Sequence, residues 1–263
     1  MKKKTLTDDL IKDIRNYAPG ISLDCVVFGY SDGVLKVLLL KYRNVDAWGL
    51  PGGFLSTDVV MQDAANEVLH KRTGLQDVFL TQYHTFSSLN RGWDVNEKSM
   101  LVIEQVQSMW PELHRKELKT WFQQRFISTA FLALIESNKA SLSNDDVSER
   151  CEWKPISDLP YLVLDHKLMI EMALEYLKVR INYLPIGKSL LGDKFTMSDL
   201  QALYESILQK KLDRGNFQRK MLKLGIFKRH EKLMTGASNK APFLYSINDE
   251  AYNRLLEEGI GYC

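Results

Sequence analysis

Positively charged side chains are concentrated in one segment near the carboxyl end of the chain. Between Gln209 and Phe243 the sequence contains ten Lys or Arg residues and two acidic residues, which gives a net charge of +8. The whole chain of 263 residues carries only +2, so the remainder sums to −6. Such an asymmetry points to a polyanionic partner, either a nucleic acid or an anionic membrane surface.

The side chains of this segment suit two kinds of contact with nucleic acid. Arginine binds guanine bidentately and Asn or Gln binds adenine in the same way, so these types are candidates for reading base edges. Cationic side chains placed on phosphates add salt-sensitive affinity without sequence information. The candidates for base edges are Arg214, Asn216, Gln218 and Arg219, and those for phosphates are Lys220, Lys223, Lys228, Arg229, Lys232 and Lys240. The plainer alternative is a solvated basic surface.

A second set of side chains has the chemistry to hold a small polar molecule. An aromatic ring beside carboxylate and imidazole groups suits a sugar, whereas an arginine suits a phosphate. Packing in a core is the alternative for each residue, because single His and Trp side chains are more often core residues than ligand contacts. The candidates are Tyr42, Trp48, Arg91, Trp93, Asp165 and His166.

The basic segment lies within a pattern typical of a winged helix-turn-helix. Thr196-Met-Ser-Asp199 has the hydroxyl and carboxylate of a capping box, and apolar residues recur after it at helical spacing. A turn is predicted at 212–215 and a basic second helix at 216–224. Two strand-like runs, 227–233 and 243–247, then form a hairpin with a polar tip. Helix, turn, basic helix and hairpin follow one another in the order of that motif.

The residues before this pattern predict a separate α/β domain. Apolar runs at 22–29 and 34–42 flank the turn residues Ser31-Asp-Gly33 and predict a hairpin. Further strands are predicted at 78–86, 126–135 and 151–156, and helices at 5–17, 60–73 and 165–182. Gly74 follows the middle helix at the position where a left-handed cap is usual. Tyr183-Leu-Pro-Ile-Gly187 precedes the change in pattern, so we place the domains at 1–186 and 187–263.

One connection, residues 94–124, is unusually long for a compact domain. Val102, Val106 and Met109 have helical spacing, and Pro111 is expected to open a second short helix that contains Trp121. A helical hairpin packed on its own domain is the simplest interpretation. A subunit contact and a lid over a pocket are the alternatives.

The stretch from Gly53 to Leu75 resembles the Nudix box at full spacing, and Leu50-Pro-Gly-Gly-Phe54 resembles the usual entry to that motif. The resemblance places Val59 at the first Glu of the box, Glu67-Val68 at its Arg-Glu pair, and Lys71-Arg72 at its Glu-Glu pair. Gly74-Leu75 matches the final glycine and aliphatic positions. The spacing of the box is therefore kept, while the acids that carry its chemistry are replaced.

The replaced acids argue against hydrolysis, because Nudix catalysis, as the resemblance implies, needs glutamates on one helical face to hold Mg²⁺. Mg²⁺ requires oxygen ligands in octahedral geometry, and Lys71 and Arg72 would add two positive charges where the metal is expected. At an effective dielectric near 20, each like-charge contact at about 4 Å costs on the order of 4 kcal/mol. We expect no catalytic residue, no metal and no cofactor. The rival hypothesis is a Nudix hydrolase acting on a nucleoside diphosphate derivative, with Asp58, Asp63 and Glu67 as relocated metal ligands.

Both halves together resemble the Nudix-related transcriptional regulators, the NrtR/AraR-like family, over about residues 20–255. The stretches that carry this resemblance are Phe195-Thr-Met-Ser-Asp-Leu-Gln-Ala-Leu-Tyr-Glu205, Leu212-Asp-Arg-Gly-Asn-Phe-Gln-Arg-Lys-Met221, Leu244-Tyr245 and Leu164-Asp165-His166. The resemblance implies a homodimer that binds a palindromic operator and responds to an effector such as ADP-ribose, a related metabolite or a pentose. The long connection at 94–124 departs from the family pattern.

Composition agrees with a protein of this class. Hydrophobic residues make up 45% and charged residues 26%, as in ordinary globular proteins. Cys25, Cys151 and Cys263 are too far apart to suggest a metal site, and they favour a reducing compartment. The basic start is followed by polar residues, so neither a signal peptide nor a membrane span is predicted and we expect a cytoplasmic protein.

The expected fold is therefore α/β (α+β), a Nudix-like mixed-sheet sandwich followed by a winged helix. The expected function is effector-controlled DNA binding. Losing the metal that helps to hold a pyrophosphate weakly favours a sugar effector, for carbohydrate metabolism, over an ADP-ribose-like one. A metabolite-binding module without DNA affinity is the third hypothesis.

Overall fold

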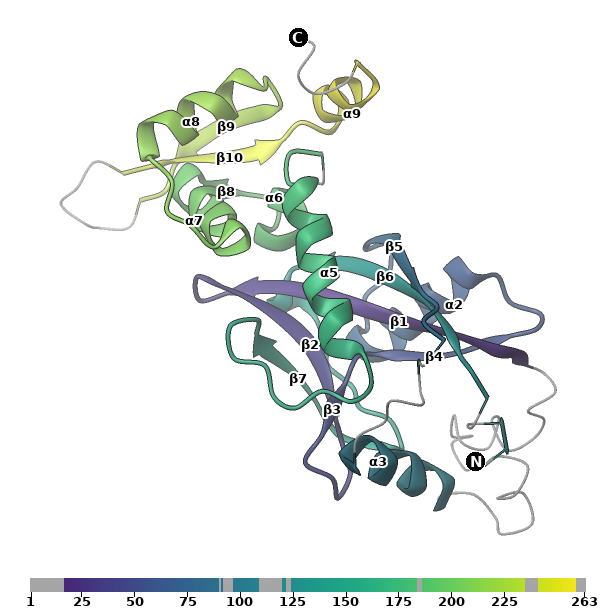
Figure 1. Cartoon of the computed structure of the whole chain (residues 1–263). Coiled ribbons are helices and arrows are strands. Elements are labelled where there is room, and N and C mark those ends of the chain that lie inside the picture. Colours follow the sequence, from purple (N-terminus) through teal and green to yellow (C-terminus); the bar gives the residue numbers. More distant parts are fainter. Residues whose placement is uncertain are drawn as a thin grey trace, which may run out of the picture.

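The computed structural model describes residues 17–89, 91, 97–108, 120–121, 124–183, 186–234 and 241–258. These residues form a large sheet domain and a smaller winged domain, and helix α5 (His166–Val179) runs from the first toward the second (Figure 1). Among the helices described, none combines the length and apolar composition needed to cross a membrane.

The larger domain is built on a mixed sheet of seven strands in the order β3-β2-β1-β6-β5, with β4 also paired to β1 and β7 to β2. Its strands β1 and β6 are parallel, and the other pairs are antiparallel. The strand bounds are β1 (Tyr17–Ser31), β2 (Val34–Tyr42), β3 (Trp48–Gly49), β4 (Gly52–Ser56), β5 (Phe79–Phe86), β6 (Ile127–Ile135) and β7 (Ser148–Pro155).

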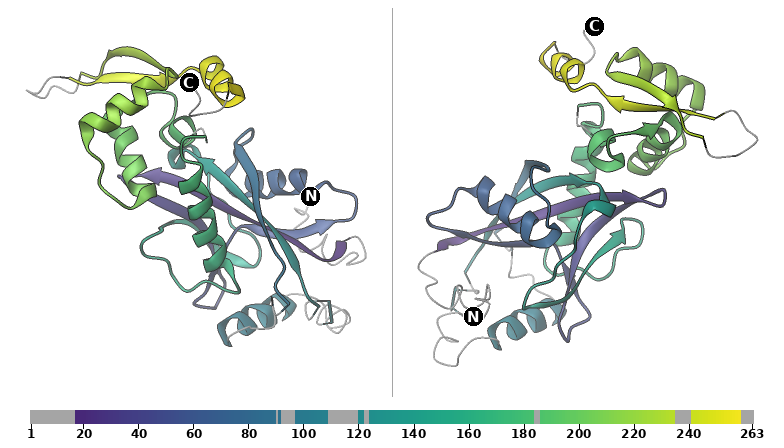
Figure 2. Two further views of the ribbon diagram at one scale, coloured as in Figure 1. Left: turned by 45° about the horizontal axis from the view of Figure 1, so that its top comes forward. Right: turned by 180° about the vertical axis from the view of Figure 1, so that it is seen from behind.

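Helices cover both faces of this sheet, and strand alternation decides which side chains each helix meets. On β1, Cys25 and Val27 belong to the core under helix α2 (Met61–Thr73), whereas Val26 and Phe28 belong to the core under α5. Strand β6 alternates in the same way. Figure 2 shows α5 and α2 on opposite sides of the sheet. Even-numbered residues of β1 and β6 therefore face α5.

The smaller domain has the winged-helix order. Its three-stranded sheet runs β8-β10-β9. The elements are α6 (Ile186–Leu191), β8 (Phe195–Thr196), α7 (Met197–Leu208), α8 (Arg214–Lys223), β9 (Phe227–Lys232), β10 (Phe243–Ile247) and α9 (Asp249–Glu258).

One hydrophobic core continues through both domains. It includes Phe28 and Leu35 of the sheet, Leu177 of α5, Leu203 of α7 and Phe217 of α8. Polar contacts accompany this packing. The backbone N–H of Leu35 donates to the Ser206 hydroxyl of α7 at 3.0 Å, and the Tyr204 hydroxyl of α7 donates to the carbonyl of Ile181 at 3.3 Å. Helix α7 is thus packed against the sheet domain.

Several sequence predictions are confirmed. The strands expected at 22–29, 34–42, 78–86, 126–135 and 151–156 and the helices expected at 60–73 and 165–182 are present with shifted bounds, and Gly74 adopts the expected left-handed cap with φ 69°. The long connection forms helix α3 (Glu97–Ser108), whose Val102 packs with Ala47 and Val163 of the sheet domain. This packing agrees with the simplest interpretation of the insertion. The remainder of its second helix lies outside the described residues, apart from helical residues 120–121.

Other predictions are wrong in their bounds. The turn predicted at 212–215 ends at Asp213, because the Asp213 side chain caps the helix that Arg214 begins. Strand β1 starts at Tyr17, so the predicted leading helix does not extend that far, and its other residues lie outside the description. The long helix ends at Val179 instead of 182. The short elements α6, β8 and the final helix α9 were not predicted.

Candidate functional site

The start of α7 is fixed by local hydrogen bonds. The Asp199 backbone N–H donates to the Thr196 hydroxyl at 3.1 Å, and the Thr196 N–H donates to the Asp199 carboxylate at 2.9 Å. This is the reciprocal pattern of a capping box. The predicted capping box is confirmed, and it sets the first helix of the helix-turn-helix.

The turn between α7 and α8 is held by one carboxylate. Glu205 accepts hydrogen bonds from the Leu212 backbone N–H at 2.9 Å, from the Gln201 amide at 3.0 Å and from Lys211 at 3.0 Å. These bonds, led by that from Leu212, lower the pKa of Glu205 from 4.5 to about 2. The amide of Gln201 also donates to the Leu212 carbonyl at 2.9 Å. The angle between the two helices therefore depends on a charged, multiply bonded glutamate.

Helix α8 buries one side and exposes cations on the other. Phe217 and Met221 are buried, and the Phe217 ring packs on that of Tyr204, with 5.2 Å between the ring centroids. The Arg219 guanidinium donates to the Asn216 amide oxygen at 2.6 Å. Five predicted DNA-binding residues on this helix are exposed and one, Gln218, is half-buried: Arg214, Asn216, Gln218, Arg219, Lys220 and Lys223.

The wing strands hold further cations beside an aromatic ring. The Arg229 guanidinium carbon lies 4.6 Å and the Lys232 ammonium 5.4 Å from the centroid of the Phe243 ring on the neighbouring strand. Lys228 of the same strand is exposed. The structure thus brings eight of the nine described DNA-binding candidates to exposed positions on α8 and β9. The tenth, Lys240, lies outside the described residues.

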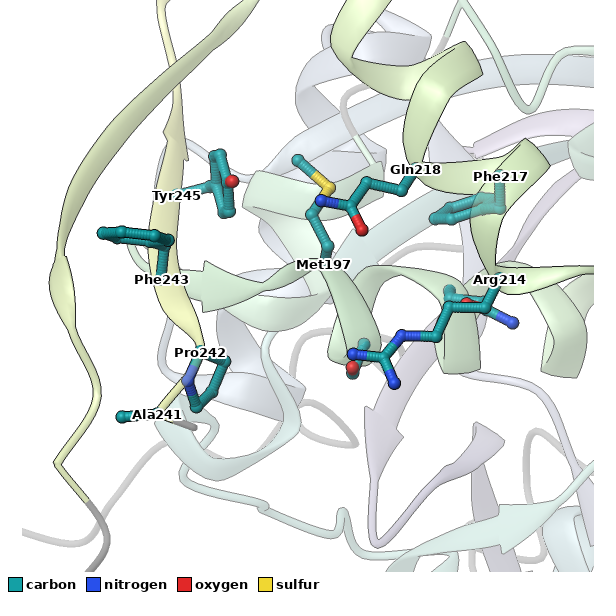
Figure 3. Close-up of a pocket in the computed structure, with 10 residues that line it drawn as sticks. Met197, Arg214, Phe217, Gln218, Ala241, Pro242, Phe243 and Tyr245 are labelled. Carbon is teal, nitrogen blue, oxygen red and sulfur yellow. The ribbon is translucent and has the colours of Figure 1, made fainter. Parts of the chain in front are cut away.

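A hollow of about 320 Å³ lies between α7, α8 and β10. Figure 3 shows the side chains of Arg214 and Gln218 pointing from α8 toward Met197, with Phe243 and Tyr245 on the opposite wall. Its lining combines apolar and polar side chains, with slightly more apolar surface. The sequence did not predict this hollow, because its walls come from three separate elements.

In the sheet domain, a buried polar cluster lies between the sheet and the start of α5. Asp24 and Ser128 are even-numbered residues of β1 and β6, and both face α5. The Ser128 hydroxyl donates to Asp24 at 2.5 Å. The Arg91 guanidinium donates to Asp165 at 2.8 Å and lies 3.5 Å from Asp24. The side chains of Arg91 and Asp24 are only 5% and 11% exposed.

His166 completes this cluster in a defined protonation state. Its Nδ1 accepts the backbone N–H of Leu50 at 3.1 Å, so the ring proton lies on Nε2, which faces Asp24 at 3.5 Å. Burial lowers the pKa of His166 from its ordinary value, against the opposing effect of Asp24 and Asp165. The imidazole is therefore neutral, and its protonated Nε2 faces a buried carboxylate.

The structure brings together three of the six predicted effector residues, namely Arg91, Asp165 and His166. Asp24 and Ser128 belong to the same cluster and were missed, because neither belongs to a recognisable sequence motif. Trp48 is a core residue, 5% exposed, and the Lys154 ammonium lies 4.4 Å from its ring centroid. The ring of Tyr42 packs against Gly49, and burial raises the pKa of its hydroxyl group. Trp93 lies outside the described residues.

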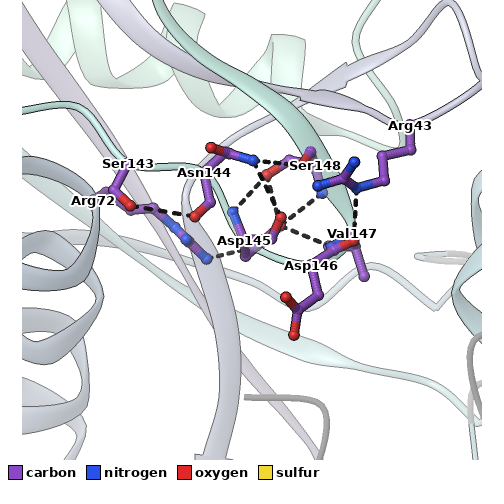
Figure 4. A network of polar contacts seen from close by, with 8 residues as sticks. All are labelled: Arg43, Arg72, Ser143, Asn144, Asp145, Asp146, Val147 and Ser148. Atoms are coloured by element: carbon purple, nitrogen blue, oxygen red, sulfur yellow. Dashed lines mark hydrogen bonds and ion pairs between the residues drawn. The ribbon is translucent and has the colours of Figure 1, made fainter. Parts of the chain in front are cut away.

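Helix α2 carries the two positive charges that the sequence places at the Glu-Glu pair of the box. The Arg72 side chain is 7% exposed and forms an ion pair with Asp145 (Figure 4). The other oxygen of Asp145 accepts the N–H groups of Val147 at 3.1 Å and Ser148 at 2.7 Å. The counter-charge of Arg72 therefore comes from a loop 73 residues away in the sequence, which the sequence did not predict.

The residues on α2 do not fit the Mg²⁺ that a Nudix box would hold. Glu67 is paired with Lys71 at 2.5 Å on the exposed side of the helix, and Arg72 is directed into the Asp145 loop. Within the part of the chain that the structure describes, no three His, Cys, Asp or Glu side chains are grouped to bind a metal ion. Magnesium needs several oxygen ligands, and this helix supplies two carboxylates, Asp63 and Glu67, of which Glu67 is already paired.

Comparisons with known proteins agree with these two domains. Residues 187–247 match the family model of the NrtR DNA-binding winged helix domain. The ADPR responsive transcriptional repressor NtrR of Acinetobacter baylyi is 25% identical over 253 residues, which is 91% of this chain and 88% of the relative.

Two solved structures share the fold of both domains. The Shewanella oneidensis NrtR structure complexed with a 27mer DNA has a TM-score of 0.64 at 22% identity, and the match covers 89% of this chain and 95% of that one. A MutT/nudix family protein from Enterococcus faecalis has a TM-score of 0.61 at 18% identity, covering 94% and 95%. The chain therefore contains a winged helix domain of the NrtR DNA-binding type at residues 187–247, and it has the fold of a Nudix-like domain followed by a winged helix.

Proposed function

We propose that this chain is a repressor that binds operator DNA through its winged helix and leaves it when ADP-ribose, or a metabolite built like it, binds the Nudix-like domain. One observation carries the proposal. The segment that matches a DNA-binding domain has a helix, α8, whose basic residues are exposed and whose opposite side is anchored in the core by Phe217 and Met221. A helix mounted in this way suits the major groove.

Within this proposal, Arg219 and Asn216 read base edges. They are exposed and bonded to each other, so each orients the other toward the groove. The phosphate contacts come from the cations around them: Lys220, Lys223, Lys228, Arg229 and Lys232 of the described residues, and Lys240. About six such contacts per domain predict that log K falls with log salt at a slope of about −5.

The buried polar cluster supports the effector part of the proposal. The Asp165 Oδ1 atom is buried and, among the described residues, has no hydrogen-bond partner. A carboxylate of this kind accepts hydroxyl groups, which ribose supplies, while Arg91 beside it can move from a carboxylate to a phosphate. The relative named as ADPR responsive favours ADP-ribose over the free sugar that we expected from the sequence. A sugar effector remains the second candidate.

We further propose that the protein does not hydrolyse its ligand. The support is the state of α2, whose Arg72 is part of a buried ion pair and whose Glu67 is paired with Lys71. A hydrolase with Asp58, Asp63 and Glu67 as metal ligands requires three carboxylates that converge, and all three are exposed positions along the start and outer side of this helix. A homodimer on a palindromic site, acting in the cytoplasm where the chromosome is, completes the proposal.

The experiment for DNA binding is capture of duplexes from a random-sequence library, followed by salt titration of the selected duplex. Wild-type protein is expected to select one palindromic motif and to show a slope near −5 per domain. Arg219→Ala is expected to lose the preference at specific base positions, while Arg254→Ala, an exposed arginine on α9, is the matched control. A slope near zero with every duplex would contradict DNA binding and favour a metabolite-binding module.

The experiment for the effector is calorimetric titration with ADP-ribose, ribose and arabinose, with release of the selected duplex as the second readout. Asp165→Asn is expected to weaken ADP-ribose binding at least tenfold, whereas Asp158→Asn, an exposed carboxylate on the loop before α5, is the control. Tighter binding of arabinose than of ADP-ribose would select the sugar alternative. Release of phosphate-containing products from ADP-ribose in the presence of Mg²⁺ would support the hydrolase hypothesis.

A further inference from the structure

The ten-residue helix α8 has three differently oriented polar sides. At about 100° per residue, Arg219 points about 180° away from the mean direction of the buried Phe217 and Met221. Gln218 and Arg214 lie on one flank of the helix, and Lys220 lies on the opposite flank, at about 80° from the buried direction. Only Arg219, with Asn216 and Lys223 near it, therefore points straight into a groove that the helix enters.

The flank that carries Arg214 and Gln218 faces the wing. Both side chains line the hollow between α7, α8 and β10 (Figure 3). The far wall of that hollow is Phe243, whose ring also lies close to the cationic groups of Arg229 and Lys232. Arg214 thus lines the hollow of about 320 Å³ on one side, and two further cations lie close to the Phe243 ring of its other wall.

Groove geometry specifies which part of a duplex meets this hollow. When a recognition helix lies in the major groove and a wing reaches the neighbouring minor groove, one sugar-phosphate strand runs between the two elements. Deoxyribose is apolar on its carbon side, and each phosphate carries a negative charge. Apolar side chains in the lining, with Arg214 among them and further cations near Phe243, are complementary to both.

We propose that the hollow between α7, α8 and β10 is the seat of this sugar-phosphate strand, with Arg214 bound to one phosphate. The inference rests on the proposed DNA binding and changes one sequence prediction, in which Arg214 was a reader of base edges. Met197 and Phe243 then pack against deoxyribose, and Ser198, an exposed hydroxyl at the edge of the hollow, lies beside the phosphate that Arg214 holds.

The test compares full-length wild-type protein, Arg214→Ala and Lys220→Ala on a duplex selected from a random library and on an unrelated duplex. Arg214→Ala is expected to weaken both complexes by the same factor and to reduce the salt slope by about 1 per bound domain. Single methylphosphonate linkages are then placed along the selected duplex. One linkage is expected to weaken wild-type binding and to have no further effect in Arg214→Ala, while Lys220→Ala remains sensitive to it.

A second variant tests whether the hollow is occupied. Ser198→Trp places a large ring at the exposed edge of the hollow, and it is expected to weaken both duplexes at least tenfold while circular dichroism stays that of the wild type. Unchanged binding by Ser198→Trp would overturn the proposal. So would an Arg214→Ala protein that keeps the salt slope and loses preference at one base position. Failure of DNA binding itself is recognised separately, because the wild-type protein would then bind neither duplex.

Discussion

The ion pair between Arg72 and Asp145 joins the altered box helix to the loop before β7, and Arg72→Met is the perturbation that tests its role. Methionine keeps most of the volume of the side chain and removes the charge. Asp145 then loses the partner of one carboxylate oxygen, although its other oxygen keeps the N–H groups of Val147 and Ser148. Lys71→Met is the matched control, because Lys71 is the next residue on the same helix and pairs with Glu67 on its exposed side.

The expected loss for Arg72→Met follows from the burial of the pair. The two side chains are 7% and 15% exposed, and removing one partner of a buried pair costs about 3–5 kcal/mol. The Nε atom of Arg72 is buried without a hydrogen-bond partner, and its removal offsets part of this cost. We therefore expect about 3 kcal/mol, the lower end of that range. The exposed pair of Lys71 and Glu67 is worth at most about 0.5 kcal/mol.

Urea unfolding and thermal unfolding, each followed by circular dichroism, measure both changes. A loss of about 3 kcal/mol corresponds to a decrease in Tm of about 6–12 °C for a protein of this size, whereas Lys71→Met is expected to stay within about 1–2 °C. Equal effects of the two substitutions, or a loss below about 1 kcal/mol for Arg72→Met, would refute the assignment of Arg72 as a buried structural partner.

Three further predictions concern single groups. The pKa of Glu205 is lowered to about 2, so its contribution to folding stability is fully present above pH 4.5 and is lost as the pH falls toward 2. The NMR signal of the Leu212 amide, which donates to Glu205, is expected to titrate near pH 2. A midpoint near pH 4.5 would disprove the role of Glu205 in holding the turn. His166 is neutral in the folded protein and becomes protonated on unfolding, so the free energy of unfolding should fall as the pH decreases below 6.5. In a His166→Gln protein this decrease should be smaller than in the wild type. Gly52→Ala should cost about 1–3 kcal/mol of folding stability, because a Cβ there would lie 2.6 Å from the Leu23 carbonyl oxygen and 2.6 Å from the Asp24 carboxylate. Gly53→Ala, where a Cβ would meet open space, should be nearly neutral in urea unfolding. Similar losses for the two substitutions would contradict this.

The sequence was sufficient for features that depend on residues close together in the chain. The capping box of α7 needs only Thr196 and Asp199, three positions apart, and the observed bonds are the expected ones. The hairpin of β1 and β2, the left-handed cap at Gly74 and the second basic helix are similarly local. The start of α8 was displaced by two residues, because the cap turned out to be Asp213.

Sequence distance limited what could be predicted for the polar cluster. Arg91, Asp165 and His166 were candidates on their chemistry alone, and nothing in the sequence paired Arg91 with Asp165, 74 residues away. Asp24 could not be predicted either, because a single acid in an apolar strand indicates a buried ion-pair partner no more than an irregularity in the strand. The even-numbered register of β1 and β6, which are parallel and 104 residues apart at Asp24 and Ser128, brings these two side chains together.

The sequence by itself thus determined the two domain types and the location of the basic surface, because patterns of spacing and charge within about 20 residues carry that information. Tertiary structure alone decided which charges are compensated. Arg72 became a buried partner of Asp145, while Arg214 faces the wing and Arg219 faces away from the core. The physical reason is that the counter-charges and walls come from distant segments, and only the packing of strands and helices brings them within contact distance.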